Sequence, residues 1–333
     1  MQVSPSQRFF FIMALVLMVI FLLLVIALVI GGPKTPVSLA VINTPFKSVD
    51  FSDLPPTQYF SAGDGTLLAF RQYSGLGTKV KGSVVLVHGS SASSESMHSM
   101  AKAFAYAGYS TFALDIRGHG HSGPKGVIHY VGQLEDDLKV FTQSVVLAKP
   151  STLVGFSSGG GFVLRIAGSD LQKIFQNYLL LSPYLGYDAP NYKPDRGGWV
   201  NVGIPRVLAL SLLNALGIEK FNHLPVTRFA LNEEAKKFLT TEYSFALASN
   251  FQAKRDYQAN IRSAHQPCSI VAGAEDEVFY TDRLEAIFQS LGKYWAVTLV
   301  PGIGHIPLIL ETKAVDAAVN ALEAMNSRTV AAQ

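Results

Sequence analysis

The sequence predicts an α/β fold in which a mostly parallel central sheet is covered by helices, with an inserted helical cap and an N-terminal transmembrane helix. Three observations lead to this prediction. An apolar run covers residues 9–30, short apolar runs alternate with helical stretches between residues 83 and 300, and the alternation stops at residues 183–262. Strands that are apolar throughout are typical of parallel sheets, because helices cover both faces of such a sheet.

Length and composition fit one large catalytic domain with an appendage, since the chain has 333 residues. Hydrophobic residues make up 49% and charged residues 15%, and the apolar excess is concentrated at the N-terminus. The net charge of +3 comes without a polybasic block, which argues against nucleic acid as a partner. Cys268 is the only cysteine, so an internal disulfide is excluded, and no Cys/His cluster at ligand spacing predicts a metal site. The sequence makes no prediction about oligomeric state.

Residues 9–30 are expected to form a single membrane anchor after a short tail, residues 1–8. At about 1.5 Å per residue the apolar run can cross a hydrocarbon core of about 30 Å. A cleaved signal peptide is the alternative, but the apolar core of a signal peptide usually spans only about 7 to 15 residues. Arg8 before the run gives a weak positive-inside bias, which predicts a cytoplasmic N-terminus and an extracytoplasmic catalytic domain.

Residues 31–56 contain five prolines and little helical periodicity, so we expect an extended spacer. The motifs that carry chemistry all lie beyond it. Removal of the residues before Lys34 is therefore expected to give a soluble, active protein.

The central sheet is expected to come from residues 57–182 and 263–328, followed by a tail at residues 329–333. Its first part is a hairpin of Gln58–Phe60 and Leu67–Tyr73 around a Gly-Asp-Gly turn. The parallel strands are expected at the apolar runs Ser83–Val87, Ser110–Leu114, Thr152–Val154, Tyr178–Leu181, Ser269–Ala272 and Val297–Val300. Functional groups of such sheets gather at the carboxyl ends of the strands.

Residues 183–262 predict a mainly helical cap over that edge of the sheet, although the same helices could instead extend the core. The segment contains a strongly apolar stretch, Ile204–Ile218, and a charged stretch with helical character, Glu233–Lys237. A helix as apolar as Ile204–Ile218 is not expected to have a fully solvated outer face, so part of it should meet lipid or substrate.

Ser157 is the candidate nucleophile. It lies in a Gly-x-Ser-x-Gly motif, from Gly155 to Gly159, that follows an apolar strand and precedes a helix. A serine presented on such a sharp turn needs small neighbours, because the flanking backbone segments approach closely. Ser158 does not fit the motif, since Phe156 stands where its first glycine would be required.

Two backbone N–H groups, those of Ser90 and Ser158, are the candidate oxyanion donors. Ser90 follows a strand that ends in Val87-His88-Gly89, and Ser158 follows the nucleophile. Acyl transfer creates a tetrahedral oxyanion, which preorganised N–H donors stabilise. His88 is interpreted as a structural residue that shapes this loop.

Asp276 and His305 are the candidates for the orienting acid and the general base. Asp276 fits a Gly-x-x-Asp loop after a late strand, whereas Glu275 and Glu277 are expected to be solvated. His305 follows the last strand among small residues. The chain order serine, acid, histidine, each just past a strand, is the order expected for such a triad on this fold.

His119 and His121 are spaced as a metal-binding pair could be, but no further ligands lie nearby in the sequence. We interpret them as parts of a structural loop beside the site.

Together these motifs resemble the monoacylglycerol lipase and lysophospholipase branch of the α/β-hydrolases, which is similar to the serine aminopeptidase S33 group. The resemblance runs from about Gln58 to Met325 and is weakest in the cap. Its motifs are Val87-His88-Gly89, Asp115-x-Arg117-Gly118-His119-Gly120-x-Ser122, the Ser157 turn, Gly273-x-x-Asp276 and Gly304-His305. It implies an α/β-hydrolase fold, the triad Ser157, Asp276 and His305, and oxyanion donors at Ser90 and Ser158.

The Ser157 turn departs from that family pattern. Relatives often have Gly-His-Ser-Met-Gly-Gly, whereas this chain has Gly155-Phe156-Ser157-Ser158-Gly159-Gly160. The difference leaves the mechanism intact and the substrate identity open.

The expected function is a membrane-anchored serine hydrolase that cleaves carboxylic esters through an acyl-enzyme on Ser157, without a metal or organic cofactor. An apolar cap and an anchor favour a lipid-like ester, such as a monoacylglycerol or a lysophospholipid. Peptidase, thioesterase and acyltransferase activities use the same machinery. A membrane-tethered binding protein without turnover is the alternative from another class.

Overall fold

The structure is a computed structural model that describes residues 4–39, 45–75, 77, 80–194 and 198–331. Part of the predicted tail 1–8, part of the predicted spacer and the last residues of the predicted tail 329–333 lie outside the described residues.

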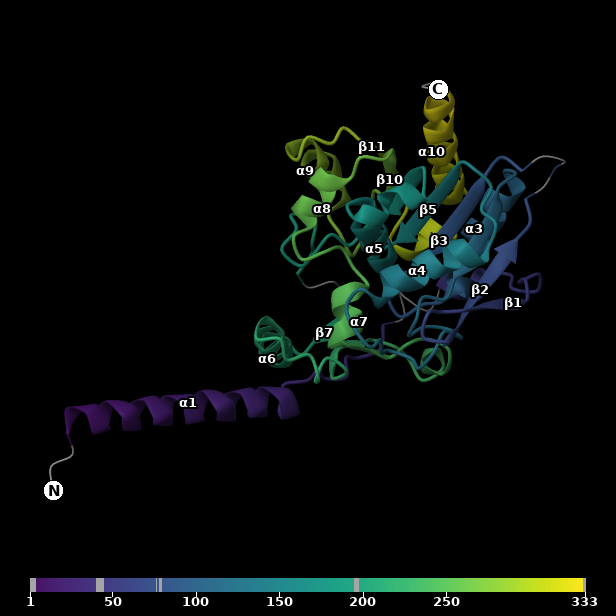
Figure 1. The fold of residues 1–333 in the computed structure, drawn as a ribbon. Helices are drawn as coiled ribbons and strands as arrows, with labels where there is room; N and C mark the ends of the chain where they lie inside the picture. Colours follow the sequence, from purple (N-terminus) through teal and green to yellow (C-terminus); the bar gives the residue numbers. More distant parts are fainter. Residues whose placement is uncertain (1–3, 40–44, 76, 78–79, 195–197, 332–333) are drawn as a thin grey trace.

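An eight-stranded sheet forms the centre of the molecule, in the order β1-β2-β4-β3-β5-β6-β10-β11 (Figure 1). β1 and β2 form an antiparallel hairpin, β2 pairs antiparallel with β4, and the other neighbours are parallel. The strands are β1 Thr57–Ser61, β2 Leu67–Tyr73, β3 Ser83–Val87, β4 Ser110–Leu114, β5 Ser151–Phe156, β6 Asn177–Leu181, β10 Cys268–Gly273 and β11 Ala296–Val300. The predicted α/β-hydrolase fold is confirmed.

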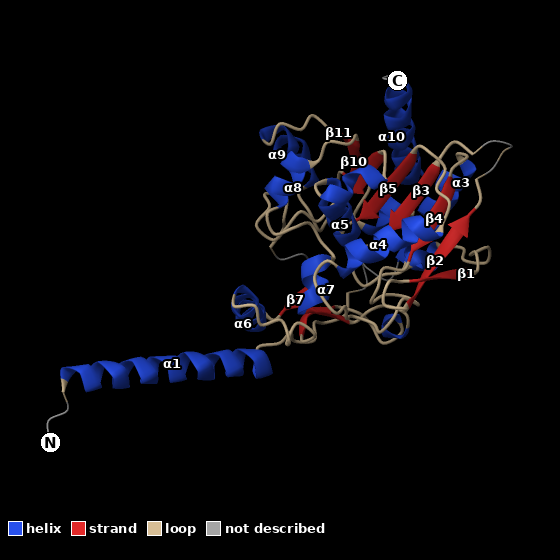
Figure 2. Cartoon of the chain, in the orientation of Figure 1, coloured by secondary structure: helices blue, strands red, loops and turns tan. Residues whose placement is uncertain are grey.

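Helices cover both faces of this sheet, as Figure 2 shows. Alternate residues of β3 point into different cores: Val85 and Val87 into one, Val84 and Leu86 into the other. The first core is closed by α4 Gln133–Ser144, α5 Ser158–Ala167, α8 Tyr257–Ser263 and α9 Leu284–Ser290. The second core is closed by α3 His98–Tyr106 and α10 Thr312–Ala331.

The region predicted as a mainly helical cap contains more helix than strand, but it also contains a small antiparallel sheet that the sequence did not predict. The sheet consists of β7 Val200–Val202, β8 Pro225–Phe229 and β9 Glu242–Ser244. Beside it lie the helices α6 Ile204–Ala215 and α7 Phe245–Asn250. The predicted helical stretch Glu233–Lys237 is only a 3-10 turn, Ala235–Lys237. These strands are too short and too polar to produce an apolar run in the sequence.

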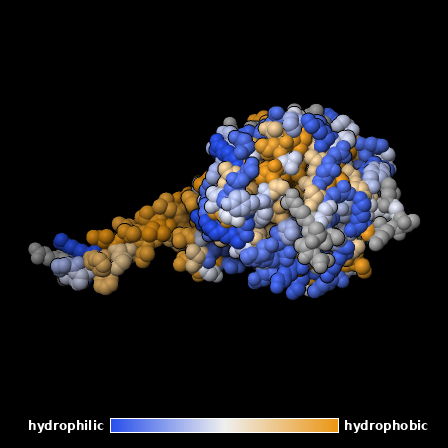
Figure 3. Space-filling model, turned by 90° about the horizontal axis from the view of Figure 1, so that it is seen from above, coloured by the Kyte–Doolittle hydropathy of each residue, from blue (hydrophilic) through white to orange (hydrophobic). Residues whose placement is uncertain are grey.

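The N-terminal helix α1 spans Pro5–Ile30 and begins before the apolar run does, because Ser4 caps it. The Ser4 hydroxyl accepts from Gln7 N at 3.3 Å, and the Gln7 side chain accepts from Ser4 N at 3.0 Å. None of the described side chains of α1 is buried, and the helix projects from the domain as a hydrophobic rod (Figure 3). By length and composition it can cross a membrane.

Residues 31–39 after α1 are extended, as predicted, whereas residues 45–56 begin with a 3-10 turn, Pro45–Ser48. Both parts are docked on the domain. We call residues 31–39 and 45–56 the strap. Lys34 N donates to Asn201 Oδ1 at 2.7 Å, and Leu39 N donates to Ala230 O at 3.1 Å, which ties the first part to the cap. In the second part, Asp53 accepts from buried His98 Nε2 at 3.0 Å. The strap therefore follows a fixed path across the protein surface.

Candidate active site

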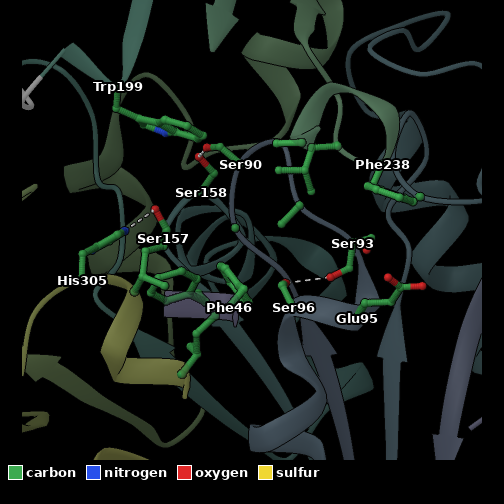
Figure 4. Close-up of a pocket in the computed structure, with 18 of the residues that line it drawn as sticks. Phe46, Ser90, Ser93, Glu95, Ser96, Ser157, Ser158, Trp199, Phe238 and His305 are labelled. Carbon is green, nitrogen blue, oxygen red and sulfur yellow. Dashed lines mark hydrogen bonds between the residues drawn. The ribbon is translucent and has the colours of Figure 1, made fainter. Parts of the chain in front are cut away.

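Ser157 lies on a strained turn between β5 and α5. Its backbone adopts φ +55° and ψ −118°, a conformation that a residue with a side chain rarely takes. Such strain is typical of a serine presented at the top of a sheet. Figure 4 shows its hydroxyl turned toward His305.

The two glycines of the motif make this turn possible. A β-carbon on Gly155 would lie 2.2 Å from the carbonyl oxygen of Gly159. A β-carbon on Gly159 would lie 2.3 Å from the carbonyl oxygen of His88, in the loop after β3. Both positions therefore require glycine, for the reason that the sequence indicated.

His305 follows β11 and reaches over the edge of the sheet to Ser157. Its Nε2 lies 3.1 Å from the Ser157 hydroxyl (Figure 4). Phe156 and Phe279 flank the imidazole at ring-centre distances of 4.7 and 5.2 Å. These two rings limit the movement of the imidazole and help to keep its Nε2 on the serine.

Asp276 follows β10 and completes the chain of hydrogen bonds. Its Oδ2 accepts from His305 Nδ1 at 2.8 Å, and its Oδ1 accepts from the backbone N–H groups of Val278 and Phe279. Burial raises the pKa of Asp276, but the neighbouring His305 and these hydrogen bonds outweigh it and hold the pKa below its ordinary value. An ionised Asp276 fixes the proton on Nδ1, so Nε2 is free to accept the Ser157 proton.

Glu275 and Glu277 are exposed, as predicted, and both also support the histidine loop. Glu277 Oε2 accepts from His305 N at 2.8 Å, and Glu275 Oε2 accepts from Ile303 N at 3.1 Å. Sequence reasoning missed this role, because it depends on a contact between two loops that follow neighbouring strands.

Ser90 lies in the loop after β3, and Ser158 directly follows Ser157 at the start of α5; their backbone N–H groups are the predicted oxyanion donors. Neither group donates to an acceptor among the described residues, and the two hydroxyls are hydrogen-bonded to each other. Ser158 is also the first residue of α5, where the helix dipole favours negative charge. The predicted donors are thus adjacent and available. His88, before Ser90, is buried and bonds Gly89 O and Ile116 N, which agrees with its structural interpretation.

A buried network from the cap holds the Ser90 loop. Ser91, whose φ is +68°, donates its N–H to the phenol oxygen of Tyr243 at 2.6 Å. That phenol donates to His119 Nε2 at 2.6 Å, since Nδ1 faces the carbonyl oxygens of Ile116 and Arg117. Burial lowers the pKa of His119 well below its ordinary value, so the ring stays neutral. The sequence offered no signal that joined these residues.

The motif from Asp115 to Ser122 holds loops together. Arg117 pairs with Asp137 of α4 at 2.7 Å and with Asp64 of the β1–β2 turn at 3.0 Å. Asp115 accepts from His121 N at 2.8 Å. Among the described residues, no group of three His, Cys, Asp or Glu side chains is placed to hold a metal ion.

Ser157 and His305 line a pocket of about 590 Å³. Its walls are mainly aromatic and aliphatic: from the core and the cap they include Phe156, Trp199, Phe238, Leu239, Ile306 and Ile309. Phe46 and Phe51 of the strap complete the wall (Figure 4 labels Phe46). This contribution was not predicted, because a proline-rich composition does not indicate what a segment packs against.

Comparison with known proteins identifies the family. The model of the family described as serine aminopeptidase, S33, matches residues 78–312. The chain belongs to this family. Its membership confirms the predicted resemblance and places the chain among the serine hydrolases. The strap and α1 lie outside the matched residues.

Individual relatives are more distant. The chain is 37% identical over 92 residues to a monoacylglycerol lipase of Mycolicibacterium smegmatis, a match that spans 26% of this chain and only 32% of that relative. A soluble variant of the monoglyceride lipase of Saccharomyces cerevisiae, solved with a substrate analogue, aligns with a TM-score of 0.62 and 16% identity over 84% of this chain and 98% of its own. The monoacylglycerol lipase of Paleococcus ferrophilus aligns with a TM-score of 0.57 and 18% identity over 78% of this chain and 98% of its own. These likenesses show the shared fold.

Proposed function

We propose that the chain is a membrane-anchored serine hydrolase that cleaves carboxylic esters of lipid-like substrates through an acyl-enzyme on Ser157. One observation carries the proposal. Ser157, His305 and Asp276 form a continuous chain of hydrogen bonds of 3.1 and 2.8 Å beside a largely apolar pocket.

This geometry supports the following first half-reaction. Ser157 Oγ attacks the ester carbonyl carbon while His305 Nε2 takes its proton, and Asp276 stabilises the imidazolium that forms. The carbonyl oxygen becomes an oxyanion and accepts hydrogen bonds from Ser90 N and Ser158 N, each worth about 3 to 4 kcal/mol in comparable sites. His305 then gives its proton to the departing alcohol, which leaves the acyl group on Ser157.

The second half-reaction releases the acid. His305 removes a proton from a water molecule, which attacks the acyl carbonyl, and the same two N–H groups stabilise the second oxyanion. Collapse of this intermediate returns the proton to Ser157. Every step uses protein groups and water.

The lipid-like substrate class is supported by the pocket and by the relatives. Phe46, Phe156 and Phe238 offer an acyl chain apolar surface, and about 0.8 kcal/mol accompanies the burial of each methylene. The relative that this chain matches over 32% of the relative's length is a monoacylglycerol lipase. Helix α1 would keep the enzyme where such lipids reside, with the catalytic domain on the extracytoplasmic side.

Labelling by a fluorophosphonate probe tests the serine mechanism. The unmodified chain should be labelled, and Ser157→Ala should lose both labelling and hydrolysis while its melting temperature stays the same. A labelled Ser157→Ala variant would assign the nucleophile elsewhere. An unlabelled, inactive wild-type chain would favour the non-catalytic binding protein.

A panel of substrates tests the reaction class. Monoacylglycerols and lysophospholipids should be hydrolysed faster than aminoacyl anilides and acyl thioesters of matched size. The comparison includes the aminopeptidase alternative, because Glu234 lines the pocket and a carboxylate can bind an α-ammonium group. Faster cleavage of the anilides would replace ester hydrolysis by peptidase activity. Acyl transfer to an added alcohol in place of water would indicate an acyltransferase.

A further inference from the structure

Helix α6 presents an apolar stripe to the outside of the protein. Ile204, Leu208, Leu212 and Leu216 are 55, 65, 49 and 68% exposed. They recur every four residues, so they lie along one face of the helix and its C-terminal end. Among the described residues that line the active-site pocket, none comes from α6. The stripe therefore does not contact an acyl chain in the pocket, and an exposed apolar surface of this kind requires another partner.

The opposite face of α6 is fixed to the cap and to the end of α1. Leu210 and Leu213 are buried in a small core with Val226 and Phe245 of the cap. Leu24 and Leu28 of α1 pack against the same core. In Figure 1, α1 runs across the view and α6 is seen nearly end-on beside the C-terminal part of α1, so the two helices cross.

Arg206 stabilises the contact between α6 and the end of α1. Its guanidinium donates to the carbonyl oxygens of Leu28 at 2.9 Å, Val29 at 3.0 Å and Pro225 at 2.7 Å. The first two are last-turn carbonyls of α1, which have no partner within the helix and carry the negative end of its dipole. One buried arginine thus joins the end of α1 to the cap.

Gly31 and Gly203 allow the two backbone segments to meet at the same place. A β-carbon on Gly203 would lie 2.6 Å from the carbonyl oxygen of Gly31, and one on Gly31 would lie 3.0 Å from Arg206 N. Arg206 N also donates to Gly31 O at 3.3 Å. The contact between the exit of α1 and the start of α6 is therefore close and has little freedom to shift.

We infer that α6 is an in-plane membrane helix whose apolar stripe inserts into the leaflet at which α1 leaves the bilayer. The inference rests on the proposed anchoring by α1. If the bilayer surrounds α1, its surface must lie near Ile30, and the Arg206 contact holds α6 at that level. A helix that crosses the end of a membrane span lies along the membrane surface, where an apolar face inserts among the headgroups and upper acyl chains. The cap is then fixed at a set depth on the bilayer.

Site-specific fluorescence on the full-length chain tests this inference. The natural Cys268 is buried, so a cysteine introduced at the surface is labelled selectively with the environment-sensitive dye NBD. Leu208→Cys and Leu212→Cys report on the stripe, and Leu17→Cys reports on α1. Val146→Cys reports on a highly exposed loop of the α/β domain, after α4. Each protein is reconstituted in nanodiscs of phosphatidylcholine and phosphatidylglycerol, which leave both membrane faces open to aqueous reagents.

The expected result is a blue-shifted emission and slow reduction by dithionite at positions 208, 212 and 17, with unshifted emission and fast reduction at position 146. If positions 208 and 212 behave like 146 while 17 stays protected, the inference is overturned and the anchoring stands. If position 17 is also reduced rapidly, the proposed anchoring itself fails, and the inference fails with it.

Arg206→Met separately tests whether the hydrogen bonds from Arg206 to α1 hold α6 at the membrane. The dye at position 212 should lose its blue shift and its protection in this background, whereas the dye at position 17 should keep both. Arg262→Met, on the exposed surface of α8, is the matched control and should change neither. Hydrolysis of a short water-soluble ester, which does not involve Arg206, verifies that the variant is folded. A folded Arg206→Met variant with full protection at position 212 would show that Arg206 does not hold α6 at the membrane.

Discussion

The phenol oxygen of Tyr243 accepts a hydrogen bond from Ser91 N at 2.6 Å and thereby ties the Ser90 loop to cap strand β9. The same phenol donates to buried His119 Nε2 at 2.6 Å. Tyr243→Phe would leave both buried groups without a partner, at a cost of about 1 to 3 kcal/mol each. We expect a lower melting temperature and a lower kcat, with a smaller change in KM, because the neighbouring Ser90 N–H is the proposed oxyanion donor and such a donor is needed most in the transition state.

Tyr294→Phe is the control for this prediction, since Tyr294 is highly exposed. Thermal denaturation and steady-state kinetics on a soluble ester measure both effects. A Tyr243→Phe variant that melts earlier but keeps its kcat would limit the phenol to a structural role.

Asp276 and Glu277 both bind His305, and their separate roles can be distinguished. Asp276→Asn should lower kcat by about ten-thousandfold, because the amide no longer fixes the proton on Nδ1. Glu277→Gln should cost far less, since the amide oxygen can still accept from His305 N. Single-turnover rates at one pH compare the two variants. A larger loss in Glu277→Gln would show that Asp276 is not the orienting acid.

The ion pair between Asp64 and Arg117 predicts a loss of stability in acid. Burial raises the pKa of Asp64, but hydrogen bonds from Arg117 and Thr66 N outweigh it and lower the pKa to about 2. The folded state thus binds the proton less well than the unfolded chain, whose pKa is about 3.9, so this contribution is complete above about pH 5 and is lost as the pH falls toward 2.

Asp64→Asn removes this pH-dependent contribution. Between about pH 5 and pH 3, the free energy of unfolding should decrease more in the wild type than in Asp64→Asn. Urea unfolding at a series of pH values gives the difference. Parallel pH profiles for the two proteins would contradict the prediction.

The parts of the fold that sequence reasoning predicted are those in which local pattern and burial agree. β3 has the predicted bounds, because Val84–Val87 is buried on both sides and forms a continuous apolar run. β7 and β9 have three residues each and were missed, since strands of this length are too short to show an alternating pattern and resemble loops in sequence. The position of the strap was missed because proline-rich segments have the same composition whether docked or free.

The candidate site likewise contains residues that the sequence predicted and residues that it did not. Ser157, Asp276 and His305 were found because each follows a strand in a short motif, and the structure brings all three together. The partnership of Tyr243 with His119 could not be found, because 124 residues separate them and neither belongs to a catalytic motif. This contact forms only in the folded chain, so no local sequence pattern reveals it.

Removal of the residues before Lys34 should lower the melting temperature, an effect that the sequence did not suggest. The triad lies beyond the cut, so hydrolysis of soluble esters should persist. The deletion exposes the core that Leu24 and Leu28 cover and removes two acceptors of Arg206, so the truncated protein should melt earlier. A truncation that begins at Leu24 and retains this contact is the comparison. Equal melting temperatures for the two truncations would indicate that the contact adds no stability.

Phe46 provides the last prediction, since it brings the strap into the active-site pocket. It lines the same pocket as Ser157, as labelled in Figure 4, and packs against the core that contains Ile306 and Ile309. An acyl chain that loses contact with this ring loses about 1 kcal/mol, or roughly fivefold in kcat/KM. Phe46→Ala should therefore lower kcat/KM for acyl chains long enough to reach the ring and leave the shortest esters nearly unchanged.

A series of esters of increasing chain length, measured together with the melting temperature, tests this expectation. Val37→Ala is the matched control, because Val37 lies in the same strap, is exposed and does not line the pocket. Equal losses on all esters with a lower melting temperature would mean that Phe46 only packs against the core. A loss that grows with chain length at an unchanged melting temperature would make the strap, a segment outside the matched family region, a determinant of substrate choice.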